Sequence, residues 1–163
     1  MIVLGKFTGF SLVIISVMLV ETLILLGVLM IQGFMPDMLF LYAILGIWVK
    51  LQALLALILF FSTWVSPMVA MFMTITSYII GHSGYTVLDY AVQHQSFGAQ
   101  VFSRILLAVF PNLEALNLKN YVATDALILP STVLIALTLG ILYIFCILYL
   151  SVYIFERKSF DAV

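Results

Sequence analysis

Charged residues are scarce in this chain. Only 8% of its 163 residues are Asp, Glu, Lys or Arg, whereas 66% are hydrophobic. A soluble domain carries about 25% charged residues, so this scarcity excludes a water-soluble globular protein. The net charge of −1 also leaves no basic surface that could attract nucleic acid. We therefore expect an integral membrane protein whose main solvent is the lipid bilayer.

Motifs that carry catalysis or bind cofactors are also missing. The single cysteine, Cys146, cannot form an intramolecular disulfide, and in its apolar stretch we expect a small buried residue. Gly5-Lys6 lacks the upstream glycine and the following Ser or Thr of a phosphate-binding loop, and the chain has no GxSxG sequence. We expect no enzyme activity, no cofactor and no ATP hydrolysis by this chain itself.

Three residues of the middle segment could in principle bind a metal ion, namely His82, Asp89 and His94. A zinc site needs three or four ligands that converge on one point. Spacings of seven and five residues do not place these side chains on one helical face. The sequence therefore predicts no metal site.

Four long apolar segments dominate the chain. We expect membrane spans at about 7–31, 38–61, 64–81 and 127–155, within a single all-α membrane domain that covers residues 1–163. A span needs about 20 apolar residues to cross a hydrocarbon core of about 30 Å. The first apolar run is too long for a signal peptide, so we expect it to be retained as a span.

Turn-forming residues separate these spans. The segment 33–37 contains Gly, Pro and Asp, which predicts a turn after the first span. The apolar run 38–80 is too long for one crossing, and Ser66-Pro67 supplies an N-cap and a first-turn proline for a new helix. The sequence Gly81-His82-Ser83-Gly84 is expected to end the third span.

The segment 82–126 is polar to mixed in character. Within it, Gln100, Ser103 and Arg104 fall on one side of a helical repeat. The other side is apolar and consists of Phe97, Val101, Phe102, Ile105, Leu106 and Val109. This pattern predicts an amphipathic helix between the third and fourth spans, lying in the plane of the membrane interface.

The positive charges outside the spans predict the orientation of the chain. With four crossings, Lys6, Arg157 and Lys158 share one side of the membrane, whereas Arg104 and Lys119 lie on the other. The side richer in Lys and Arg is usually the cytoplasmic one. We therefore expect both termini in the cytoplasm.

Two ionisable residues, Glu21 and Lys50, lie inside the first and second spans. Such a residue costs roughly 2.5–3.5 kcal/mol at the centre of a membrane helix. If a short turn joins the two spans, the two residues lie at similar depth and can form an ion pair inside the bundle. The pair could belong to a polar substrate or proton path, or it could fix the register of two helices. We favour the structural role because no second buried carboxylate forms a relay.

The order of several short motifs resembles a known family. Gly5-Lys6-Phe7 opens a span, a span pair breaks at Ser62–Pro67, and the run Phe110–Leu118 follows an amphipathic helix. The last long span ends in Phe155–Phe160. Together these motifs resemble the later part of an ABC-2 type transporter permease, the membrane subunit of certain ABC exporters. The first span and the coupling helix that usually precede this part of such permeases are expected to be lacking here.

The resemblance implies a permease subunit in the inner membrane of a bacterium. It would form a homo- or hetero-oligomer with another membrane subunit and bind a separate ATP-binding cassette subunit on the cytoplasmic side. No catalytic residues carry over, because the family keeps its chemistry in the ATPase. The candidate cytoplasmic contacts are Lys6, Glu156, Arg157 and Lys158.

Two other functions stay open. The chain could be a small structural or assembly membrane protein without transport activity, since Glu21 and Lys50 are the only obvious polar groups inside the spans. A membrane-embedded enzyme has less support, because no catalytic constellation is present. The transported substrate is not indicated by the sequence, since mostly apolar spans are compatible with polar solutes, lipids, peptides and drugs.

Overall fold

The computed structural model describes residues 2–33, 35, 37–94, 97–110, 113–117 and 130–160. These residues form helices and turns and contain no strand. The helices are α1 (Ile2–Ile31), α2 (Met38–Ser62), α3 (Pro67–Gln93), α4 (Phe97–Val109) and α6 (Pro130–Phe160).

Three helices of the described part are long and apolar enough to cross a membrane. They are α1, α2 and the Ser131–Arg157 part of α6. Each exceeds the 20 or so residues that a bilayer core requires. The chain is therefore all-helical where it is described, and its apolar helices are those of an integral membrane protein, in agreement with the expected class.

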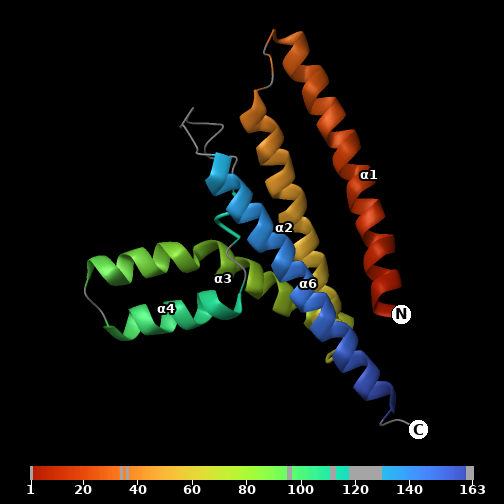
Figure 1. Cartoon of the computed structure of the whole chain (residues 1–163), viewed down its shortest axis with the longest axis vertical. Helices are drawn as coiled ribbons and strands as arrows, with labels where there is room; N and C mark the ends of the chain where they lie inside the picture. Colours follow the sequence, from red (N-terminus) through yellow and green to blue (C-terminus); the bar gives the residue numbers. More distant parts are fainter. Residues whose placement is uncertain are drawn as a thin grey trace.

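Figure 1 shows α1, α2 and α6 running along the long axis of the molecule, with the N- and C-termini at the same end. Helices α1 and α2 are antiparallel neighbours. Helices α2 and α6 are parallel. Near their starts, Ala43 of α2 packs with Val133 of α6. Further along both helices, Ala53 of α2 and Ile144 of α6 belong to one core cluster. The core of the molecule therefore lies along the contact between α2 and α6.

The turn at residues 113–117 completes this core. Leu113 and Leu116 are almost fully buried and pack with Val49, Ala53 and Ile144. Close approach depends on Gly140 of α6, since a methyl group added there would lie 2.6 Å from Cγ1 of Val49 and 3.3 Å from Cδ1 of Leu116. The small residue Gly140 thus lets α6 approach both α2 and the 113–117 turn closely.

Helix α3 begins as expected but ends later than expected. Ser66 is its N-cap and Pro67 lies in its first turn. The predicted helix end at residues 81–84 is wrong, since the helix continues to Gln93. A glycine inside a helix costs only about 1 kcal/mol. Gly81 and Gly84 are buried, and the Gly81 carbonyl accepts a hydrogen bond of 3.2 Å from the backbone N–H of Leu113. Gly81 therefore contacts the 113–117 turn from inside a continuous helix.

The predicted third span, 64–81, is therefore the first part of α3, which is not among the three helices with span-like composition. The second part of α3 turns back through α4, and the two form a hairpin that points away from the long helices (Figure 1). The side-chain amide of Gln100 donates a hydrogen bond of 3.2 Å to the carbonyl of Ala91, which ties α4 to α3.

Helix α4 occupies the segment predicted to be an amphipathic helix. Its Ser103 is 1% exposed and faces the packed side, whereas Phe97, Phe102 and Ile105 are exposed. These three apolar side chains therefore point away from the rest of the molecule. An amphipathic helix that lies in the membrane interface stays a prediction.

Two expectations about the outer spans need adjustment. Helix α1 starts at Ile2 instead of residue 7, because residues 2–5 are apolar and continue the hydrophobic segment beyond Lys6. The expected fourth span, 127–155, corresponds to α6, which begins at Pro130 and continues to Phe160, while residues 127–129 lie outside the described part.

The expectation that Cys146 is buried is wrong, since it is exposed on α6. The packed side of α6 contains Val133, Gly140, Ile144 and Leu148, which recur at helical spacing. Cys146 follows Ile144 by two residues and therefore falls off this side.

Candidate functional site

A chain of polar side chains lies where α2, α3 and the 113–117 turn meet. The ammonium of Lys50 lies 5.5 Å from the ring centre of Tyr78. The Tyr78 ring stacks on His82, with ring centres 5.9 Å apart and planes 4° apart. Nδ1 of His82 lies 2.8 Å from Oε2 of Glu114. The amide of Asn117 lies 3.4 Å from both carboxylate oxygens of Glu114. We call these five residues the polar cluster.

Three elements of the fold position the polar cluster. Tyr78 and His82 are four residues apart on α3, so their side chains lie on the same helical face. Glu114 and Asn117 belong to the turn that the buried Leu113 and Leu116 anchor in the core. The site therefore depends on the same turn that fills the contact between α2 and α6.

The polar cluster is only partly shielded. The side chains of His82 and Glu114 are 38% and 35% exposed, so one side of the pair is open to its surroundings. The 2.8 Å between Nδ1 of His82 and Oε2 of Glu114 is the distance of an ion pair when His82 is protonated. Nδ1 is nevertheless not aligned for a hydrogen bond with the carboxylate. The Lys50 ammonium over the face of Tyr78 has the geometry of a cation–π contact. The cluster can hold or pass a proton, or bind a polar group from a partner.

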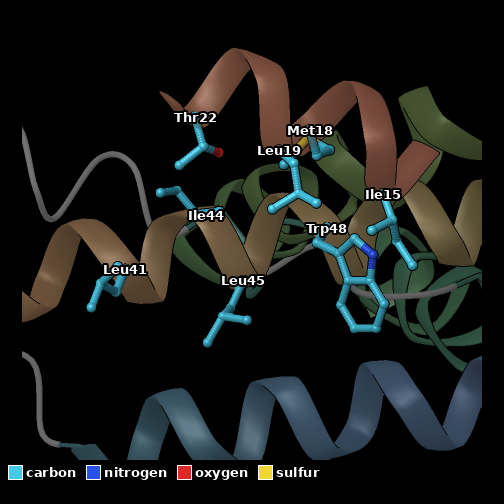
Figure 2. A pocket seen from close by; sticks show the side chains of 8 residues that line it. All are labelled: Ile15, Met18, Leu19, Thr22, Leu41, Ile44, Leu45 and Trp48. Carbon is cyan, nitrogen blue, oxygen red and sulfur yellow. The ribbon is translucent and has the colours of Figure 1, made fainter. Parts of the chain in front are cut away.

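A groove between α1 and α2 reveals the register of the two helices. Figure 2 shows Thr22 of α1 near the level of Ile44 of α2, and Ile15 beside the ring of Trp48. Figure 1 shows that the end of α1 extends beyond the start of α2.

The ion pair between Glu21 and Lys50 stays a prediction. Glu21 adjoins Thr22, which Figure 2 shows near Ile44, and Lys50 follows Ile44 by six residues on α2. Glu21 is exposed on α1, and the Lys50 ammonium lies over the ring of Tyr78 on α3.

The proposed cytoplasmic contacts lie at one end of the molecule. Lys6 is exposed near the start of α1, and Glu156 and Arg157 are exposed near the end of α6. The guanidinium of Arg157 lies 4.6 Å from the ring centre of Tyr153. Lys158 belongs to α6, but its side chain lies outside the described part.

The three candidate metal ligands are distributed along α3 and do not meet. His82 contacts Glu114, Asp89 is exposed, and His94 stacks on Tyr90 with ring centres 4.0 Å apart. In the part of the chain that the structure describes, no three His, Cys, Asp or Glu side chains gather as metal ligands would.

Sequence reasoning missed Tyr78 and Glu114 as site residues. The spacing of Tyr78 and His82 could have suggested a shared helical face. Glu114 had no comparable indication, because its contact with His82 depends on how the 113–117 turn folds back onto α3.

Comparisons with known proteins do not identify a relative. No protein-family model, curated protein or solved structure matches this chain.

Proposed function

We propose that this chain is the membrane-spanning permease subunit of an ABC-type export complex and that a separate subunit hydrolyses ATP. The observation that carries the proposal is the position of the chain ends. Figure 1 marks both termini at one end of the molecule, and exposed charged residues of α1 and α6 lie there. Such an end offers one surface on which a cytoplasmic ATPase can dock. The order of sequence motifs described above supports the same proposal.

The loose packing of α1 also supports a subunit of a larger assembly. None of the most apolar stretch of α1 is buried, although the helix is long enough to cross a bilayer. Association of membrane helices depends on packing and hydrogen bonds, because lipid is as apolar as the side chains. Within the proposal, another membrane subunit supplies contacts along α1.

The proposal includes four crossings with both termini in the cytoplasm of a bacterium. Since α2 and α6 are parallel, the chain between them must return across the same thickness. In the proposal, the predicted third span at 64–81 makes this return, and the apolar side of α4 rests in the interface. Accessibility of single cysteines to a membrane-impermeant reagent, with Cys146 replaced by Ser, tests this topology.

The main test is purification of the tagged chain from its own host in mild detergent, followed by mass spectrometry. We expect an ATPase subunit with a phosphate-binding loop at stoichiometric level. Lys6→Glu combined with Arg157→Glu should reduce its recovery, whereas the matched control Arg104→Glu, on the α3–α4 hairpin, should not. Recovery of the chain without any ATPase would contradict the proposal.

A second candidate function is a structural or assembly protein without transport activity. The observation in its favour is that two grooves, one between α1 and α2 and one between α1, α2 and α6, are lined mostly by apolar side chains, so neither provides a polar path for a solute. In the same purification, this function predicts stoichiometric recovery of other membrane proteins and no ATPase.

A further inference from the structure

Glu21 is an isolated charge on the most apolar of the three candidate membrane spans. Its side chain is exposed on α1, and no described residue forms an ion pair or a hydrogen bond with its carboxylate. Val17, Ile24 and Val28, which lie on the same side of the helix, are exposed and apolar. Ionisable groups inside membrane helices almost always have a partner or face a water-filled cavity. The carboxylate of Glu21 therefore indicates a partner outside the described part of the chain.

The position of Glu21 along α1 keeps it inside the hydrocarbon core. Lys6 lies 15 residues before Glu21, and Gln32 lies 11 residues after it. These separations correspond to about 22 and 16 Å along a helix. A core of about 30 Å that begins at either of these polar residues includes Glu21. Bulk water is therefore not the ordinary solvent of this carboxylate.

The packed side of α1 does not provide the missing partner. Ile15 and Thr22 line the groove between α1 and α2, and Figure 2 shows their side chains directed from α1 toward α2. Glu21 is not among the residues that line this groove. None of the most apolar stretch of α1 is buried in this chain, so the side that contains Glu21 is free to meet another helix.

We propose that Glu21 binds a transmembrane helix of another membrane protein that carries a lysine or an arginine at the same depth. Val17, Ile24 and Val28 form the apolar surface on which this helix packs. Charge complementarity selects this occupant, because a cation neutralises the carboxylate, whereas a hydroxyl or an amide would leave a charge in hydrocarbon. Apolar side chains alone would not select any partner, since lipid is as apolar as they are.

A second copy of this chain does not offer such a cation in the described part. Copies with the same orientation that pair through this side of α1 place one Glu21 against another, and two carboxylates at one site repel each other. Lys6 and Arg157 lie at the end of the molecule that contains the termini, and Arg104 lies on the α3–α4 hairpin. The ammonium of Lys50 lies over an aromatic ring of α3.

The inference deepens the proposed permease function, in which another membrane subunit contacts α1. It names the residue and the chemistry of that contact and rests on the proposed function only for the identity of the partner. The two proposals can fail separately. Recovery of an ATPase tests the permease function, whereas the charge preference of Glu21 tests the inference.

The test uses the full chain in phosphatidylcholine vesicles and two synthetic peptides. Each peptide is a polyleucine membrane helix flanked by tryptophans, with a photoreactive group near its centre. One peptide carries an arginine at the centre, and the other carries a leucine. The arginine peptide should reach half-maximal cross-linking to α1 at an about tenfold lower peptide-to-lipid ratio, which is the preference expected from one polar contact between membrane helices. Equal cross-linking by the two peptides would overturn the proposal.

Variants of Glu21 identify the group that carries this preference. Glu21→Leu removes the carboxylate, so the two peptides should then cross-link equally. Glu21→Gln keeps the side-chain shape without the charge, and it should also lose the preference if the leucine variant does not fold. The matched control Thr22→Val removes a hydroxyl on the side that faces α2 and should keep the full preference. A preference that persists in either Glu21 variant would overturn the proposal.

A photoreactive amino acid in place of Val17 identifies the occupant in the host. We expect cross-links to a membrane helix of another protein with a lysine or an arginine at matching depth. Replacing that cation by leucine should lower the cross-linked yield about tenfold opposite Glu21, and it should have no effect opposite Glu21→Leu. Cross-links to a second copy of this chain, or to a helix without lysine or arginine, would contradict the proposal.

Discussion

Helices α1 and α6 have nearly the same length and a similar apolar composition, yet they pack very differently. None of the most apolar stretch of α1 is buried, compared with 22% of the corresponding stretch of α6. Helix α6 joins the core cluster through Ile144 and Leu148, whereas α1 reaches that cluster only through the partly buried Phe7. Hydropathy therefore predicts which helices contact lipid, but it does not predict which of them pack together.

The position of small residues explains this difference. On α6, Gly140 faces Val49 and Leu116 at distances that leave no room for a methyl group. On α1, Gly5, Gly9 and Gly27 have no neighbouring atom within reach of an added methyl group. Glycine promotes close packing of membrane helices only where a partner surface lies opposite.

The largest expected effect is that of Gly140→Ala. The added methyl group would clash with Val49 at the crossing of α2 and α6, and overpacking of this kind typically costs about 1–3 kcal/mol. We expect a loss of that size in the free energy of unfolding. Titration of the purified chain with sodium dodecyl sulfate in mixed micelles, followed by tryptophan fluorescence, measures it.

The matched control is Gly27→Ala on α1, where an added methyl group meets no atom of the chain. Alanine has a higher helix propensity than glycine by about 1 kcal/mol, so this variant should be neutral or slightly more stable. Equal destabilisation by both substitutions would remove the distinction between a packed α6 and a loosely attached α1.

A smaller effect is expected from the contact that ties the 113–117 turn to α3. In Glu114→Gln the carboxylate opposite His82 is lost while the side-chain shape is kept. Because the pair is partly exposed, we expect a loss of about 0.2–1 kcal/mol. The same detergent titration measures the loss, and the effect should disappear in a His82→Phe background. A full effect in that background would show that Glu114 acts through another residue.

Most of the fold could be predicted from the sequence, because helix length and apolar composition determine which segments can span a bilayer. The break at Ser66-Pro67 was also predictable, since a cap and a first-turn proline are local features. The continuation of α3 through Gly81 and Gly84 was not, because tertiary contacts such as the hydrogen bond from Leu113 to Gly81 cannot be seen in a local pattern.

The candidate site was less predictable than the fold. Lys50 could be found as an isolated charge in an apolar run, but its neighbour Tyr78 comes from another helix. The contact between His82 and Glu114 joins residues 32 positions apart, and no sequence periodicity connects them. The predicted pairing of Glu21 with Lys50 depends on the register of α1 and α2, which is set by the path of the residues between the two helices.

The smallest expected effect tests that register directly. Glu21→Met and Lys50→Met, made singly and together, form a double-mutant cycle in the free energy of unfolding. Residues more than about 7–10 Å apart without shared partners usually show coupling below about 0.3–0.5 kcal/mol. Glu21 is exposed on α1 and Lys50 lies over the ring of Tyr78 on α3, so the two effects should add. Coupling of about 1 kcal/mol or more would mean that α1 slides along α2 until the two charges meet, and α1 would then be held by an ion pair instead of by loose apolar contacts.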